Sequence, residues 1–410
     1  MLNDRKKYLL IISIVGPGLI TVNAGNDAGG IATYSTVGAT YGFKMLWGLL
    51  LITFSLAVIQ EMNARMAVVT GKGLSDLIRE NFGIKFSVFA MLTLFIANFG
   101  VCVGDFAGVA ASLELFGISK FISVPIIAIM VWLLITKGTY SIAEKVFLSF
   151  TLVFFTYIIT CFKVRPDWPV VLKALVTPTL EFDRAFILTF IGMIGTTITP
   201  YMQFYLQSSV VEKGIKLEEY KYEKLDVYLG AIWGDLVSFF IIVCTAITLH
   251  QANIHINSAE EAASALKPLA GNYASVLFAF GLLGASILAV TIIPLSTTYA
   301  ICESFGFERG VNHSLNEAPA FYGIFTFMVF FSAVLTLIPN ISLVHIMLIT
   351  QQIAGILSPV ILIFMVLLIN RKEVMGNFVN SRTQNLVIWI TVLFIITLSI
   401  LLVVLPFLNM

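Results

Sequence analysis

Charged residues are scarce in this chain of 410 residues. Lys, Arg, Asp and Glu make up 11% of the sequence, whereas a soluble globular domain carries about 25%. Hydrophobic residues account for 59% of the sequence, and the mean hydropathy is +0.96. This composition excludes an ordinary soluble domain and predicts an all-α integral membrane protein. The net charge is only +1, so the charge balance does not indicate a nucleic-acid partner.

Cysteine and histidine are also few, and neither occurs at a metal-binding spacing. The four histidines form no HExxH pattern, which argues against an intramembrane metalloprotease. No nucleophile–base pair or cofactor motif stands out, so we expect neither an enzyme nor a bound cofactor. The cysteines lie in separate apolar segments without a CxxC spacing, which predicts buried thiols rather than disulfides; they are Cys102, Cys161, Cys244 and Cys302.

Long apolar runs dominate the chain instead. A bilayer is crossed by about 20 apolar residues, and the sequence predicts eleven such spans. A cleavable signal peptide is not indicated, because the first run follows a short charged lead and has no small-residue cleavage site. The spans are expected at residues 8–38, 43–69, 86–113, 121–137, 143–163, 184–212, 225–250, 273–305, 319–338, 342–369 and 384–407.

The distribution of Lys and Arg predicts the orientation of these spans. With the N-terminus in the cytoplasm, cytoplasmic segments and span ends hold sixteen Lys and Arg residues, against seven on the outer side. Lys and Arg are enriched in cytoplasmic loops, so we expect a cytoplasmic N-terminus and, with eleven spans, a C-terminus outside. The expected location is the cell (plasma) membrane.

The first span is interrupted by the sequence Asn23-Ala24-Gly25-Asn26-Asp27-Ala28-Gly29-Gly30. Backbone without helical hydrogen bonds is tolerated at membrane depth only where protein encloses it or a cavity adjoins it. A carboxylate at that depth indicates a functional site. The alternative is a kinked helix in which Asp27 pairs with a neighbouring side chain.

The sixth span has a second interruption at Thr196-Thr197-Ile198-Thr199-Pro200. Proline removes an amide donor and disfavours helix at the preceding residue. The threonines could supply oxygen ligands, or they could only satisfy the freed backbone groups. Two broken helices five spans apart are typical of a transporter site at a repeat interface. We therefore expect inverted five-helix repeats at residues 1–163 and 164–369, with residues 370–410 as an additional helix.

Several motifs give the chain a resemblance to the Nramp family of divalent metal-ion transporters. The resemblance covers nearly the whole chain and depends on the order and spacing of the motifs. It implies a LeuT-like fold with 11 transmembrane helices and transport by alternating access. The motifs are Gly16-Pro17-Gly18 followed by Asp27 and Gly29, Tyr41-Gly42 with Leu46-Trp47, Thr70-Gly71-Lys72, Arg165-Pro166-Asp167-Trp168, Gly281-Leu282-Leu283 to Glu303 and Phe305, and Gln351 with Pro359.

The same resemblance implies a metal site at Asp27, Gly30, Thr196 and Thr199, with departures from the family at three positions. Gly30 stands where the family has asparagine, Thr196 where it has an alanine whose carbonyl is a ligand, and Thr199 where it has methionine. The chain is thereby most similar to the Nramp-related magnesium transporter branch. Without the soft thioether, the site would consist of oxygen atoms and water, which suits a hard cation. We expect hydrated Mg²⁺ as the substrate, with Mn²⁺ also accepted.

The residues that carry protons in the family are missing as well. Tyr201 replaces a histidine, Asp105 is not followed by a carboxylate one turn later, and residues 319–341 contain no Lys or Arg. Tyrosine has an unperturbed pKa of about 10 and is a poor proton carrier near neutrality. We therefore expect transport that is not coupled to protons.

Further polar residues are accessory candidates, and other functions stay open. Asp235 is expected to make helix–helix hydrogen bonds, with a relay or a secondary cation site as the alternative. Other functions are a proton-coupled Mn²⁺ or Fe²⁺ transporter, a LeuT-fold transporter of amino acids or organic solutes, and a membrane receptor. The expected partners are the cation and the lipid bilayer; the oligomeric state is open, and a monomer is compatible with the sequence. The accessory candidates are Asn23, Asn26, Thr197, Tyr201, Gln351 and Asp105.

Overall fold

The computed structural model describes residues 21, 25–137, 155–311 and 313–404, and these residues form helices without any strand. Short helical turns occur at Leu217–Glu219, Ala246–His250, Ser264–Leu266 and Gly271–Tyr273. The α-helices are α3 (Ala28–Tyr41), α4 (Leu46–Thr70), α5 (Leu74–Phe82), α6 (Ile84–Glu114), α7 (Lys120–Thr136), α9 (Phe155–Val164), α10 (Trp168–Val176), α11 (Arg184–Thr197), α12 (Pro200–Glu212), α13 (Tyr220–Thr245), α14 (Ala259–Ala263), α15 (Lys267–Ala270), α16 (Ala274–Phe305), α17 (Pro319–Thr336), α18 (Leu343–Ile369), α19 (Lys372–Met375) and α20 (Arg382–Val404).

Eight helical segments among the described residues are long and apolar enough to cross a membrane. Two shorter apolar helices, α7 and α9, match the expected fourth span and the end of the fifth. The expected first and fifth spans extend into residues outside the described ones, so the number of eleven spans stays a prediction. The sixth expected span is divided, as its sequence predicted, between α11 and α12.

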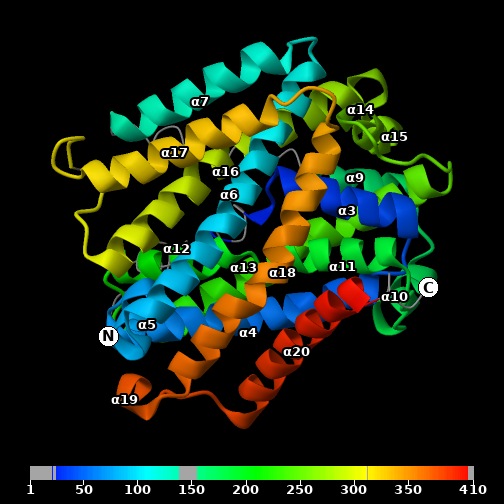
Figure 1. Ribbon diagram of the computed structural model, residues 1–410. Coiled ribbons are helices and arrows are strands. Elements are labelled where there is room, and N and C mark those ends of the chain that lie inside the picture. The colour runs from blue at the N-terminus through cyan, green and yellow to red at the C-terminus, as the bar shows by residue number, and fades with distance from the viewer. Residues whose placement is uncertain (1–20, 22–24, 138–154, 312, 405–410) are drawn as a thin grey trace, which may run out of the picture.

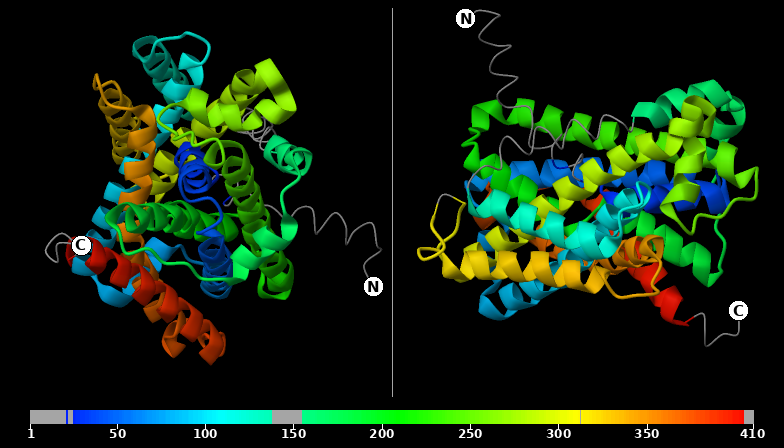
Figure 2. Two further views of the ribbon diagram at one scale, coloured as in Figure 1. Left: turned by 90° about the vertical axis from the view of Figure 1, so that its right-hand side faces the viewer. Right: turned by 90° about the horizontal axis from the view of Figure 1, so that it is seen from above.

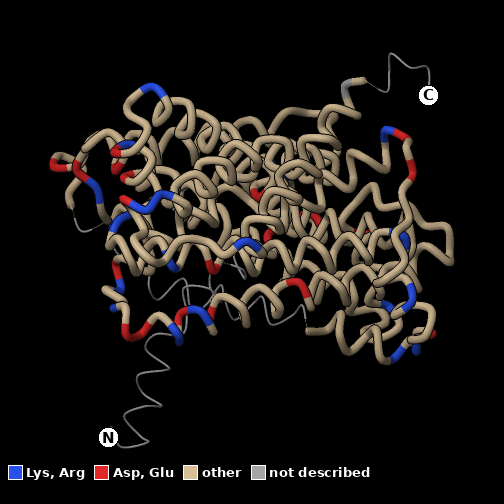
Figure 3. The backbone as a smooth tube through the Cα atoms, turned by 90° about the horizontal axis from the view of Figure 1, so that it is seen from below, with Lys and Arg blue, Asp and Glu red and all other residues tan. Residues whose placement is uncertain are grey.

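The two ends of the helix bundle differ in which connections they carry. The short helices α5 and α19 lie at one end, and α10, α14 and α15 lie at the other (Figure 1). Charged residues gather at both ends, and few lie in between (Figure 3). This arrangement fits a bundle whose middle section lies in the hydrocarbon part of a bilayer.

Helix α3 lies near the centre of the bundle when the bundle is viewed from its end (Figure 2, left). Its neighbours are α13, α18, α11, α6 and α16. Helices α11 and α18 cross without side chains between them, since a methyl group on Gly195 would meet the backbone of Gly355 and the carbonyl of Gln351. Small residues permit such close helix contacts in membranes. The crossing brings Gln351 next to the start of α3.

Candidate functional site

The first candidate element is the start of α3, where Asp27 is the N-cap residue. The Gly30 amide donates to Asp27 Oδ1 over 2.6 Å, as expected for a side-chain cap. The Ala28 amide donates to Asp105 Oδ1 on α6 over 3.2 Å. Two carboxylates therefore accept hydrogen bonds from the positive end of the α3 dipole. Both are buried, with exposed fractions of 1% for Asp27 and 0% for Asp105.

The second element is the break between α11 and α12. The Thr199 hydroxyl donates to the Thr196 carbonyl over 2.9 Å, and the Gln203 amide donates to the Thr199 carbonyl over 3.4 Å. The Thr197 hydroxyl donates to the carbonyl of Met193 over 2.7 Å. The Thr196 carbonyl has no helical donor because residue 200 is a proline, and the Thr199 hydroxyl satisfies it. The Thr199 carbonyl also accepts the Met202 amide over 3.2 Å. For Thr197 and Thr199, these bonds are the ones that the backbone-satisfying alternative requires, and a role as cation ligands stays a prediction.

The Thr196 hydroxyl behaves differently from these two. It is buried and has no hydrogen-bond partner among the described residues. A methyl group in place of a Gly30 hydrogen would lie 2.8 Å from Thr196 Oγ1, 3.2 Å from the Gly25 carbonyl oxygen and 3.3 Å from Asp27 Oδ1. Three oxygen atoms, two from the first break and one from the second, therefore surround the position that a side chain on residue 30 would occupy.

Gln351 of α18 contributes to the same place. Its amide nitrogen donates to Asp27 Oδ1 over 3.2 Å and to Oδ2 over 3.1 Å, while its amide oxygen has no partner among the described residues. The side chain lies against the Cα of Gly29, where any larger residue would displace it. If this amide rotated, its free oxygen would face the Asp27 carboxylate in place of the nitrogen. The amide oxygen could then coordinate a cation that is bound to Asp27.

The remaining accessory candidates surround this centre, except for Asn23, which lies outside the described residues. Asn26 donates to the Gly234 carbonyl of α13 over 3.5 Å and accepts from Ser238 over 3.4 Å. The Tyr201 hydroxyl and Asp105 Oδ2 are both buried and have no hydrogen-bond partner in the described part of the chain. The structure thus brings all the described candidates close to the two breaks.

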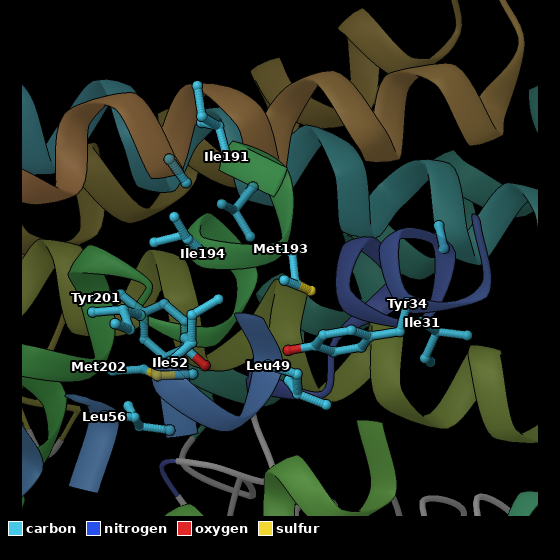
Figure 4. Close-up of a cluster of buried hydrophobic side chains, with 14 of the residues drawn as sticks. Ile31, Tyr34, Leu49, Ile52, Leu56, Ile191, Met193, Ile194, Tyr201 and Met202 are labelled. Atoms are coloured by element: carbon cyan, nitrogen blue, oxygen red, sulfur yellow. The ribbon is translucent and has the colours of Figure 1, made fainter. Parts of the chain in front are cut away.

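Met202 is a neighbour of the site that sequence reasoning missed. Its sulfur lies 3.6 Å from the position that a methyl group on Gly25 would occupy, and the Gln60 amide nitrogen approaches this sulfur at 3.9 Å. Figure 4 shows Met202 and Tyr201 beside the α4 side chains of Ile52 and Leu56. The available signal was the spacing, because residue 202 lies on the same helix face as residue 199. A thioether is therefore present beside Gly25, although position 199 lacks one.

Charge at the site comes only from carboxylates. The ion pairs found among the described residues involve neither Asp27 nor Asp105. No group of three or more His, Cys, Asp or Glu side chains in the described ranges could hold a metal ion. The place beside Gly30 thus has the Asp27 carboxylate and neutral oxygen atoms around it, with the Asp105 carboxylate on the neighbouring amide of Ala28. Such a set suits a cation that keeps part of its water shell.

Sequence comparison identifies relatives over almost the whole chain. The family model for Nramp, described as natural resistance-associated macrophage protein-like, matches residues 18–405. A divalent metal cation transporter MntH from Deinococcus radiodurans is 24% identical over 403 residues, covering 95% of this chain and 89% of the relative. The MntH of Yersinia pestis is 23% identical over 399 residues, covering 95% and 94%.

Solved structures with the same fold include a manganese transporter of Eremococcus coleocola, in complex with an aromatic bis-isothiourea substituted compound. It has a TM-score of 0.75 and 19% identity, covering 95% of this chain and 86% of its own. MHP1, a nucleobase-cation-symport-1 family transporter in a closed conformation, has a TM-score of 0.51 and 16% identity, covering 96% and 92%. At these identities the likeness concerns the fold.

Proposed function

This chain belongs to the Nramp family, and from that premise we propose that it carries a divalent metal cation across the membrane through the site at Asp27. It is an integral membrane protein with the LeuT-like fold, as its sequence predicted. Its curated relatives are named divalent metal cation transporters, and its structural neighbour is named a manganese transporter. Transport is the common function of these relatives.

One observation supports the position of the site more than any other. Three oxygen atoms lie within 3.3 Å of the position that a methyl group on Gly30 would occupy: Asp27 Oδ1, Thr196 Oγ1 and the Gly25 carbonyl oxygen. These atoms come from both broken helices, which are the elements that line substrate sites in this class of transporter. A relative movement of the two breaks would separate the ligands and release the cation, as alternating access requires.

The ligand atoms favour hard cations. Carboxylate, hydroxyl and carbonyl oxygens suit Mg²⁺ and Mn²⁺, whereas thioether sulfur suits softer metals. We infer that both Mg²⁺ and Mn²⁺ are carried. The names of the relatives favour Mn²⁺, and the small Gly30 favours a cation that retains water, as Mg²⁺ does. The Met202 sulfur lies 3.6 Å from the position of a methyl group on Gly25 and is not one of the proposed direct ligands.

Transport without proton coupling is part of the same proposal. Tyr201 occupies the position of a family histidine, and helix α17 contains no Lys or Arg. The competing function is proton-coupled Mn²⁺ transport, which has the same fold and the same carboxylate. The two differ in whether cation entry acidifies the vesicle interior.

The orientation and the internal symmetry belong to this proposal too. We place the N-terminus in the cytoplasm of a plasma-membrane protein, so that α5 and α19 face inward. The break before α3 and the break between α11 and α12 then correspond to each other in two inverted repeats, residues 1–163 and 164–369, followed by the additional C-terminal helix.

Flux into proteoliposomes tests the proposal. The full chain is expected to admit Mn²⁺ and Mg²⁺ along their gradients without acidification of the interior, as followed by enclosed metal and pH dyes. Asp27→Asn keeps the shape of the side chain and is expected to lower the flux more than about 100-fold, since it removes the only charged ligand. Asp167→Asn, in an exposed loop position, is the matched control. Flux of neither cation would refute the proposal, and acidification that follows Mn²⁺ would establish the proton-coupled alternative.

A further inference from the structure

A buried ion pair lies on α4, apart from the site described above. Arg65 Nε lies 3.1 Å from Glu61 Oε1, and Arg65 Nη2 donates to Glu61 Oε2 over 3.2 Å. The exposed fractions of the two side chains are 7% for Arg65 and 1% for Glu61. A buried ion pair is by itself weak evidence for stability, so the groups that bind this pair indicate its role.

The arginine binds the connection between α19 and α20. Arg65 Nη1 donates to the carbonyl oxygens of Phe378 and Val379 over 3.0 and 3.1 Å. Arg65 Nη2 also donates to Asn380 Oδ1. The planar fork of donors on arginine suits several acceptors at once, and a lysine ammonium lacks this geometry.

The glutamate binds the first turn of α13 and the first turn of α20. Gln384 of α20 donates to Glu61 Oε2 over 2.8 Å, and the Tyr220 hydroxyl of α13 donates to Glu61 Oε1. Three segments therefore meet at the ion pair of α4. We call this group the inner cluster, which consists of Glu61, Arg65, Tyr220, Phe378, Val379, Asn380 and Gln384.

Beyond the inner cluster, α20 packs loosely against its neighbours. The described side chains of α20 that are buried form one stripe, Ile388, Val392, Ile395 and Leu398. A cavity of about 260 Å³ lies between α20 and the helices α4 and α11. Protein interiors contain few voids larger than a water molecule, so the apolar packing of α20 against α4 is incomplete.

The two halves of the second broken helix are held by different neighbours. Asn63 of α4 donates to Gln203 of α12 over 2.6 Å, so α12 is bound to α4. Helix α11 is held by α18, since the crossing at Gly195 and Gly355 leaves no room for a methyl group. The break between α11 and α12 is therefore the place where α4 and α12 can move relative to α11 and α18.

At the inner end of the bundle, α20 connects these two groups of helices. Asn370 at the end of α18 and Asn385 of α20 exchange two hydrogen bonds of 2.8 Å each. The inner cluster binds the same end of α20 to α4. Inward release of a cation by alternating access requires the inner ends of the helices to separate around the site. Movement of α4 and α12 away from α18 would stretch the bonds of the inner cluster.

We propose that the inner cluster is a latch, whose bonds hold the inner end closed and break when the cation is released to the cytoplasm. The inference rests on the proposed function, since it assumes alternating access and a cytoplasmic position for α5 and α19. The ion pair suits this role because both charges belong to α4. When Arg65 leaves the carbonyls of the connection, it keeps Glu61 as its partner, and neither charge is left unpaired.

Pulsed electron paramagnetic resonance on the spin-labelled full chain tests the latch. Labels at Lys221→Cys on α13 and Glu373→Cys on α19 occupy exposed positions on the two sides of the inner cluster, and the native cysteines are buried. We expect mainly one shorter distance, that of the closed inner end, when no other residue is changed. Arg65→Lys keeps the charge beside Glu61 but loses the fork of donors, and it should raise the fraction of a longer distance about threefold.

A second variant leaves the ion pair intact. Gln384→Leu removes the donor that α20 directs at Glu61, and it should raise the same fraction about twofold. Ser381→Ala is the matched control, because it removes a hydroxyl at the start of α20 that bonds Gln384 and neither charge of the pair. This control should leave the distances unchanged. If Arg65→Lys does not fold, Gln384→Leu still decides the question.

The outcomes separate the latch from the proposed function. Suppose that the wild type carries Mg²⁺ or Mn²⁺ into proteoliposomes and that the folded latch variants keep its distances. That result would overturn the latch and leave the transporter assignment standing. Absence of flux of both cations in the wild type would overturn the proposed function and, with it, the role of the latch in release.

Discussion

The two helix breaks differ in how their polar groups are satisfied. At the start of α3, the free amides of Ala28 and Gly30 are bonded by carboxylates, which bring negative charge to the centre of the bundle. At the break between α11 and α12, neutral side chains of Thr199 and Gln203 donate to the carbonyls of Thr196 and Thr199. The first break therefore supplies charge, and the second supplies neutral groups, among which the Thr196 hydroxyl has no partner in the described residues.

Because of this difference, two threonines that look equivalent in the sequence have different hydrogen bonds. Thr196 and Thr199 are both buried and both next to the break. Only the Thr199 hydroxyl is needed by the backbone, whereas the Thr196 hydroxyl is free to meet a cation. The comparison predicts a binding role for Thr196 and a mainly structural role for the Thr199 side chain.

Among variants that keep the Asp27 carboxylate, the largest effect is expected from filling the place between the two breaks. Gly30→Ala puts a methyl group 2.8 Å from Thr196 Oγ1 and 3.3 Å from Asp27 Oδ1, so both oxygens must move. We expect Mn²⁺ affinity, measured by isothermal titration, to fall by about 10- to 100-fold. Gly323→Ala is the matched control, because nothing lies within 4 Å of the added methyl group.

A double variant sharpens this prediction. Thr196→Ala removes the oxygen that the new methyl group meets, so Gly30→Ala with Thr196→Ala should recover the melting temperature lost in Gly30→Ala. The affinity should stay low, because the hydroxyl ligand is then missing. Recovery of affinity together with stability would show that Thr196 does not bind the cation. Two residues in contact are expected to be non-additive in this way.

The two threonines themselves provide the next test. Thr196→Val is expected to lower Mn²⁺ affinity by about tenfold with little change in melting temperature. Thr199→Val removes a bond to a buried carbonyl and is expected to destabilise the fold by about 1 kcal/mol while changing affinity less than Thr196→Val does. Equal losses of affinity in both variants would contradict the division between the two breaks.

Gln351 is expected to have a smaller effect. Gln351→Leu keeps the approximate side-chain volume but removes both the donor to Asp27 and the free amide oxygen. We expect affinity to fall by a few-fold, on the scale of one neutral hydrogen bond of about 1 kcal/mol. Titration of Mn²⁺ measures it, and an unchanged affinity would remove Gln351 from the set of accessory ligands.

Met202 is expected to affect selectivity alone. Met202→Leu removes a sulfur that lies beside Gly25 without changing the proposed oxygen ligands. Competition by Cd²⁺ against Mn²⁺ flux should weaken by at most a few-fold, because sulfur prefers the softer metal. Mg²⁺ and Mn²⁺ flux should stay as in the wild type. A marked loss of Mn²⁺ flux would instead make Met202 a direct ligand.

The sequence predicted the features that depend on local chemistry. A carboxylate and glycines within an apolar run predicted the break at Asp27, and Thr199-Pro200 predicted the break between α11 and α12. The sequence could not predict that Thr196 and Thr199 have different roles, because the roles depend on which of the two hydroxyls lies next to a carbonyl. Met202 was missed because its proximity to Gly25 is a contact across 177 positions of the chain.

The central claim is that the cation binds between the two breaks, and anomalous scattering from crystals of the full chain with Mn²⁺ tests it most directly. The account predicts a difference peak in contact with the Asp27 carboxylate and Thr196 Oγ1, beside the Cα of Gly30. A principal peak that contacts neither residue would contradict it.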